Sequence, residues 1–122
     1  MNVKALLGTA VATLVVSYLC NVYFYLPIVE GNPAPGTALL PLWGSIAVFQ
    51  TVGAVLLDWV NGRVKDAMRS ALIIALAQIA LVDVYYVLNG TRSVTAAAAS
   101  AVILLMVWVA GGFVYGKLQA SA

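Results

Sequence analysis

The chain has 122 residues, of which 64% are hydrophobic and 8% are charged, and its mean hydropathy is +1.04. A soluble domain has about 45–50% apolar and about 25% charged residues, so the composition excludes an ordinary soluble protein. Histidine is absent and there is one cysteine, which excludes histidine-ligated metals and haem as well as an intramolecular disulfide. The net charge of +2, from scattered cations, offers no basic surface for nucleic acid.

Three uncharged stretches lie between the charged residues, at 5–29, 31–57 and 93–116, and a fourth apolar stretch, 70–88, is interrupted only by Asp83. A transmembrane helix needs about 20 mostly apolar residues. The sequence therefore predicts an all-α integral membrane protein with four transmembrane helices in a single domain. The predicted helices cover about residues 5–26, 38–60, 67–88 and 93–115.

Turn-forming residues mark the predicted helix ends. Pro27 disfavours continuation of the first helix, and Asn61-Gly62 is expected to end the second. Pro41 fits the first turn of the second helix, where its missing N–H has no helical partner. The segment 30–36, which begins with Glu30 and contains two prolines, is expected to be a stiff, exposed loop.

The distribution of cations predicts the orientation. Four spans place both termini on one side, and that side collects Lys4, Arg63, Lys65, Arg69 and Lys117. The opposite side has only Arg92. Because cytoplasmic loops carry the excess of Lys and Arg, we expect both termini to be cytoplasmic and the helices to form an antiparallel bundle in the cell (inner) membrane.

Small and polar residues indicate which helix faces contact protein. Lipid tails are as apolar as leucine, so helices in a membrane associate through close packing and hydrogen bonds. The predicted packing positions are Thr9, Thr13 and Ser17 in the first helix, Ala71 and Ala75 in the third, and Gly112 and Gly116 in the fourth. The two glycines form a G-x-x-x-G spacing at the membrane edge, which we interpret as local packing rather than a dimer interface.

Three uncharged polar residues are candidates for an intramembrane functional site. Gln50 and Gln78 fall near the middle of the second and third helices, so they are expected to hydrogen-bond across the core. A structural link is favoured over a solute path, because neither side chain ionises and no second polar layer continues inward. Asn21 is the most polar candidate in the first helix.

Asp83 is the most informative residue, because carboxylates within a span are rare and mark ion or proton pathways. A regular helix places it roughly opposite the face of Ala71 and Gln78, so a second polar neighbour is expected there. The candidates are an ion pair with Arg92 folded back over the turn, Asn21 or a tyrosine of the first helix, and another subunit. An interfacial carboxylate without chemistry is an equal alternative.

Catalysis by the isolated chain is not predicted. No carboxylate pair lies at matched depth, since Glu30 would meet Asp83 only if the loop folded down, and Cys20 has no neighbouring base. The chain can still be a non-catalytic subunit of a membrane enzyme. No cofactor or metal is predicted, although a lipid, quinone or pigment can sit between apolar helices without any motif.

The size and four-span plan resemble the small multidrug transporters, which work as dimers around a glutamate in the first helix. This first helix has no carboxylate, so the resemblance extends only to the architecture. The favoured prediction is an accessory or stabilising subunit of a larger membrane complex. Its partners would be the lipid bilayer and either other transmembrane subunits or further copies. The alternative is a small homodimeric proton-coupled, ion or solute transporter that uses Asp83.

Overall fold

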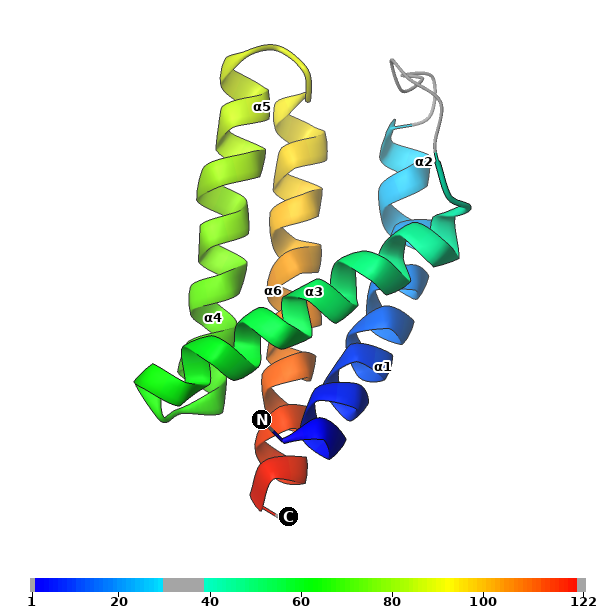
Figure 1. The fold of residues 1–122 in the computed structure, drawn as a ribbon. Helices are drawn as coiled ribbons and strands as arrows, with labels where there is room; N and C mark the ends of the chain where they lie inside the picture. The colour runs from blue at the N-terminus through cyan, green and yellow to red at the C-terminus, as the bar shows by residue number, and fades with distance from the viewer. Residues whose placement is uncertain (1, 30–38, 121–122) are drawn as a thin grey trace.

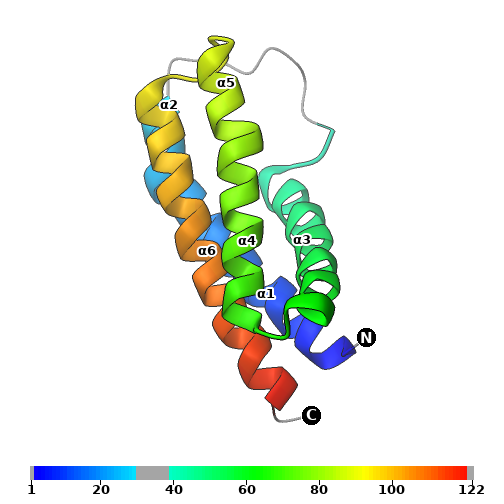
Figure 2. The same ribbon diagram turned by 90° about the vertical axis from the view of Figure 1, so that its left-hand side faces the viewer.

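The computed structural model describes residues 2–29 and 39–120, which form a bundle of helices (Figures 1 and 2). Within these residues, four helices are long and apolar enough to cross a membrane. They are spans 1 to 4, namely Val3–Val29, Leu42–Val64, Ala67–Leu88 and Val94–Ala120. The first and last described residues lie at one end of the bundle, here the terminal end, and the turn between spans 3 and 4 lies at the other, the turn end (Figure 1).

Spans 1 and 3 are each interrupted by a π-helical turn. Span 1 consists of α1 (Val3–Cys20), η1 (Asn21–Tyr25) and α2 (Leu26–Val29). Span 3 consists of α4 (Ala67–Gln78), η2 (Ile79–Asp83) and α5 (Val84–Leu88). Spans 2 and 4 are the single helices α3 (Leu42–Val64) and α6 (Val94–Ala120). A π turn inserts one extra residue, so every side chain after it is rotated by about 100° around the helix axis.

Two predicted helix ends lie elsewhere in the structure. Span 1 continues through Pro27 to Val29. The π turn directly before the proline provides the reason, since a widened turn relieves the clash of the ring with a preceding carbonyl. The second helix begins at Leu42, later than predicted, with Pro41 in extended conformation as its N-cap. Glu30 and most of its loop lie outside the described residues.

The third helix, Ala67–Leu88, has the predicted bounds, whereas the second and fourth helices end later than predicted. The second helix passes through Asn61-Gly62 and ends at Val64, where Lys65 adopts a left-handed conformation with φ 61°. Asn61 supports this extra turn by donating from Nδ2 to Gln119 Oε1 at 3.3 Å. The fourth helix continues to Ala120. Side-chain contacts between the ends of α3 and α6 therefore outweigh the local preference for a turn.

The predicted position Gly112 and its neighbour Gly111, which was not predicted, bring α6 close to two helices at once. Gly111 faces α1, and a Cβ there would lie 2.7 Å from Thr13 Cγ2. Gly112 faces α4, and a Cβ there would lie 2.8 Å from Ala71 Cβ. Gly116 also lies against Ala67 of α4. The other predicted packing positions are all buried, namely Thr9, Thr13, Ser17, Ala71 and Ala75, and three of them, Thr9, Thr13 and Ala71, lie against these glycines. Two adjacent glycines therefore let one helix pack closely on both sides.

Helix α3 crosses the bundle obliquely (Figure 1). It packs along α1 and approaches α4 toward the terminal end, whereas its beginning stands away from α5 (Figure 2). The indole of Trp108 from α6 lies directly against Gly53 of α3, where a Cβ would lie 2.5 Å from the ring. This tilt leaves space between α3 and the other spans at the turn end.

Candidate functional site

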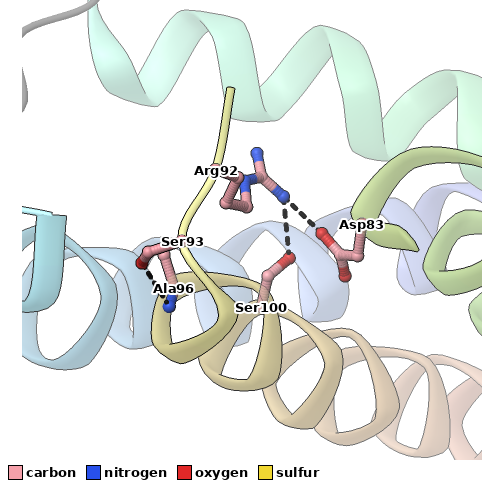
Figure 3. A network of polar contacts seen from close by, with 5 residues as sticks. All are labelled: Asp83, Arg92, Ser93, Ala96 and Ser100. Atoms are coloured by element: carbon pink, nitrogen blue, oxygen red, sulfur yellow. Dashed lines mark hydrogen bonds and ion pairs between the residues drawn. The ribbon is translucent and has the colours of Figure 1, made fainter. Parts of the chain in front are cut away.

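Arg92 is the centre of a polar cluster at the turn end of the bundle (Figure 3). Its side chain reaches back from the turn into the bundle, and Nη1 forms an ion pair with Asp83 Oδ1. The same nitrogen donates to Ser100 Oγ of α6 at 3.5 Å. The guanidinium carbon also lies 5.1 Å from the ring centre of Tyr86 and 5.7 Å from that of Tyr25. One cation thus connects spans 1, 3 and 4.

The π turn of span 3 determines where Asp83 points. A regular helix would place Asp83 roughly opposite Ala71, as the sequence predicts. The extra residue in η2 instead rotates Asp83 onto the same inner face as Ala71 and Ala75, and it is only 3% exposed. Tyr85, predicted to share the Ala71 face, is turned outward and is 59% exposed. The predicted orientation of Asp83 is therefore wrong, because the helix contains one extra residue before it.

The π turn of span 1 has the same effect on Tyr25. Ser17 and Cys20 are buried, and on a regular helix the next residue on the same inner face would be Phe24. With the extra residue of η1, Phe24 faces outward at 61% exposure and Tyr25 turns inward to Arg92. Both π turns therefore bring a polar side chain to the same cation. Turns of this kind occur frequently at functional sites.

The Asp83 carboxylate is incompletely satisfied. Its Oδ1 is paired with Arg92, but Oδ2 is buried and has no hydrogen-bond partner among residues 2–29 and 39–120. Taking a carboxylate out of water costs several kcal/mol, and an opposite charge offsets this cost only when the remaining lone pairs also have hydrogen bonds. Each buried acceptor without a hydrogen bond costs about 1–3 kcal/mol more. The pair is thus retained at a cost to stability, which is typical of a functional site.

A cavity of about 330 Å³ lies beside Arg92, between spans 1, 2 and 4. It is a cleft that opens at the surface of the bundle rather than a sealed void. Its polar lining consists of Ser17, Asn21, Tyr25, Ser45, Gln50, Arg92 and Ser100. Its apolar lining consists of Ile46, Phe49, Ile103, Leu104 and Val107. The volume is at the lower end of the range of about 300–1,000 Å³ for ligand pockets, so the cavity suits a small molecule.

Gln50 is the most buried polar residue of this cavity. It is 2% exposed, and its Oε1 has no hydrogen-bond partner in the described part of the chain. The expected bond to Gln78 is not formed, because Trp108 lies between the two residues' helices and donates from Nε1 to Gln78 Oε1 at 2.9 Å. Asn21 is satisfied locally, with Nδ2 donating to the Ser17 carbonyl at 2.8 Å. Gln50 therefore lines the cavity, and its buried Oε1 is an unused acceptor.

Comparisons of the chain with protein-family models, curated proteins and solved structures find no match. The chemistry of the site therefore has to follow from its own residues. No group of three or more His, Cys, Asp or Glu residues that could hold a metal ion occurs in the described ranges. The single cysteine, Cys20, is buried in span 1.

A second polar cavity, of about 340 Å³, lies at the terminal end. It is lined by Asn2, Asp58, Asn61, Gly62, Lys65, Tyr115 and Gln119. The hydroxyl of Tyr115 donates to Asp58 Oδ1 at 2.6 Å. The sequence analysis expected no second polar layer. Part of the lining, Asn61, Gly62 and Gln119, lies where α3 and α6 continue beyond their predicted ends.

A closely packed apolar layer separates the two cavities. Along α3, Gly53 and Leu57 lie between Gln50 of the first cavity and Asp58 of the second. Along α6, Trp108 occupies the corresponding position. Leu57 and Trp108 are both fully buried, and the Trp108 ring fills the space left by Gly53. The polar cavities are thus arranged in series with an apolar barrier between them.

Sequence reasoning missed several residues of this arrangement. Trp108 looked like one more apolar residue in a transmembrane helix, and only its burial against a glycine distinguishes it. Ser100 carried a weak signal as the one serine inside the alanine-rich segment 96–101. Tyr25 and Tyr115 lie near helix ends, where aromatic residues are common in membrane proteins, but each contacts a charged side chain inside the bundle.

Proposed function

We propose that the protein is a small membrane transporter for a polar solute, with the cavity beside Arg92 as its binding site. The observation that carries the proposal is the pair of polar cavities near opposite ends of α3 and α6, with Leu57 and Trp108 between them. A carrier needs a site that is open to one side while a barrier closes the other. The arrangement fits a carrier with its turn end open.

The topology predicted from the cations gives this carrier a direction. With both termini in the cytoplasm, the cavity beside Arg92 opens toward the outer side and the cavity with Asp58 faces the cytoplasm. The solute would then bind from outside, and movement of α3 relative to α6 would transfer access to the other side. Gly53 lies directly against the Trp108 ring, so we assign the pivot of that movement to this contact.

An accessory subunit is the second candidate function. One of the candidate neighbours of Asp83 was another subunit, but in the structure Asp83 pairs with Arg92 of the same chain. One observation still favours it: among the described spans, span 3 buries the smallest share of its apolar segment, 22% compared with 33–39% for the others. That surface consists of side chains such as Ile73, Leu76 and Leu81, for which lipid is a sufficient neighbour.

The proposal is tested by uptake of labelled solutes into proteoliposomes that contain the purified chain. The solutes should represent carboxylates, zwitterions, amines and neutral polyols. We expect one class to enter faster than into empty liposomes, and Gln50→Leu to reduce that uptake at least about tenfold. Thr51→Val is the matched control, because the neighbouring Thr51 points outward and bonds only to its own helix.

The transporter proposal is wrong if no solute class crosses faster than into empty liposomes. If, in addition, gentle extraction from the native membrane yields the chain with other chains in fixed stoichiometry, the accessory subunit is the better description. Gln50→Leu uptake equal to that of Thr51→Val would show that solute passes elsewhere than through this cavity.

A further inference from the structure

We infer that two hydrogen bonds between α3 and α6 at the terminal end form a latch, which holds the turn end of the protein open. The latch consists of the bond from Tyr115 to Asp58 and the bond from Asn61 to Gln119. This role rests on the proposed function, because only a carrier that alternates between two open states needs such a latch. Three features of α3 carry it: where the helix is bonded to α6, where it pivots, and what surrounds the two bonds.

Helix α3 is hydrogen-bonded to its neighbours in one half only. In its terminal half, Asp58 Oδ1 accepts from the Tyr115 hydroxyl at 2.6 Å, and Asn61 Nδ2 donates to Gln119 Oε1 at 3.3 Å. In its turn-end half, residues 42–52, no side chain forms a hydrogen bond or ion pair with a described residue of another span. The terminal half of α3 is therefore fixed to α6, whereas the turn-end half is not.

Helix α6 is the stationary partner, because span 3 holds it in place. Trp108 Nε1 donates to Gln78 Oε1 of span 3 at 2.9 Å, and Gly112 lies against Ala71 of α4. Helix α3, by contrast, packs along α1 without a hydrogen bond between the described residues of the two helices. A movement that transfers access between the two cavities is therefore a movement of α3.

The pivot lies at the middle of α3, since Gly53 is the central residue of this 23-residue helix and lies directly against the Trp108 ring. Each half of the helix is about 16 Å long, so a rotation of about 15° around Gly53 moves each end by about 4 Å. The two ends move in opposite directions. Rotation that brings the beginning of α3 toward α6 thus narrows the cavity beside Arg92 and draws Asp58 and Asn61 away from α6.

The latch can open without leaving its polar groups unbonded. Asp58, Asn61, Tyr115 and Gln119 all line the cavity at the terminal end, so water can replace the two bonds when α3 moves away. One hydrogen bond between helices of a membrane protein changes an equilibrium constant by about threefold on average. The two bonds together therefore favour the state with the turn end open by about tenfold, which a transport cycle can reverse.

The test measures two distances between α3 and α6 in the purified chain in liposomes. Pairs of spin-labelled cysteines in a Cys20→Ala background are compared by double electron–electron resonance. The pair Arg63→Cys and Lys117→Cys reports the separation at the terminal end. The pair Trp43→Cys and Val94→Cys reports the separation at the turn end. All four labelled positions are exposed, so the labels do not disturb the packing.

The latch is broken from α6 alone by Tyr115→Phe together with Gln119→Ala. The first change keeps the ring, and Gln119 is exposed, so neither change leaves a void. We expect a second population, in which the terminal distance is about 4 Å longer and the turn-end distance about 4 Å shorter. Its abundance relative to the first should rise about tenfold over the unmodified protein. Tyr115→Phe alone should cause a change in the same sense of about threefold.

Tyr85→Phe is the matched control, because it removes a tyrosine hydroxyl from the exposed surface of span 3 and should leave both distances unchanged. A longer terminal distance without a shorter turn-end distance would overturn the inference, since the helix ends would then separate without rotation around Gly53. Unchanged distances in both latch variants, or the same shift in Tyr85→Phe, would also overturn it.

Uptake by the unmodified protein separates this inference from the proposed function. If a solute crosses the membrane but the distances do not change in the latch variants, only the latch is wrong. If the two distances change in opposite directions but no solute class crosses, the movement of α3 stands and the proposed function is wrong.

Discussion

The ion pair of Asp83 and Arg92 predicts a large and asymmetric effect of mutation on stability. Arg92→Gln would leave the carboxylate of Asp83 buried at 3% exposure without a counter-ion. Breaking a buried pair in this way costs about 3–5 kcal/mol of unfolding free energy. Asp83→Asn should cost less, about 1–3 kcal/mol, because the Arg92 side chain is 22% exposed and can reach water.

The double variant decides whether the two residues act as one unit. Removing both charges leaves no lone ion in the bundle, so the variant with both changes should be within about 1 kcal/mol of the unmodified protein. The coupling energy from the cycle is then about 3 kcal/mol or more. The free energy of unfolding is measured by titration from mild detergent into SDS, followed by circular dichroism and extrapolated linearly.

Arg63→Gln is the matched control for that cycle, since Arg63 lies over the exposed ring of Trp59 at the terminal end. Its effect should be within about 0.5 kcal/mol, as for most surface substitutions. If Arg92→Gln also costs less than about 1 kcal/mol, or if the two single effects simply add, the two charges are not coupled inside the bundle and the reasoning is refuted.

Three further substitutions test the packing by the same titration. Gly112→Ala should cost about 1–3 kcal/mol, because its Cβ would meet Ala71 Cβ at 2.8 Å and neither group can rotate away. Gly62→Ala should raise the free energy of unfolding by up to about 1 kcal/mol, since that helical glycine has open space around it. Equal effects of Gly112→Ala and Gly62→Ala would show that α6 and α4 are not in close contact. Tyr115→Phe should cost about 1 kcal/mol through loss of the 2.6 Å bond to Asp58, and no loss would mean that this bond is not formed in the membrane.

The existence of the spans could be predicted from the sequence, whereas their ends could not. Charge spacing identifies apolar stretches long enough to cross a bilayer, and the structure contains four such helices among its described residues. Pro27 and Asn61-Gly62 are strong local signals for ends, but both lie inside helices. Local preference amounts to about 1–3 kcal/mol, and contacts at the ends of packed helices can exceed it.

The candidate site was only partly predictable for a different reason. Asp83, Gln50 and Asn21 stand out because polar residues are costly in a membrane. Their neighbours depend on the π turns, which a regular helical period does not reveal and which bring polar groups together inside the bundle. One inserted residue changes the inward face after it, so a regular helical period places Asp83 on the wrong side.

The central claim is that a water-accessible cavity lies beside Arg92 inside the bundle. It is tested most directly by single cysteines on α6 in a Cys20→Ala background. Ser100 lines the cavity, and Val102, two positions farther along, is 57% exposed on the apolar surface. We predict that a membrane-impermeant charged thiol reagent reacts at least about tenfold faster with Ser100→Cys than with Val102→Cys, since only the first side chain meets water. Equal rates at the two positions, or no reaction at position 100, would contradict the account.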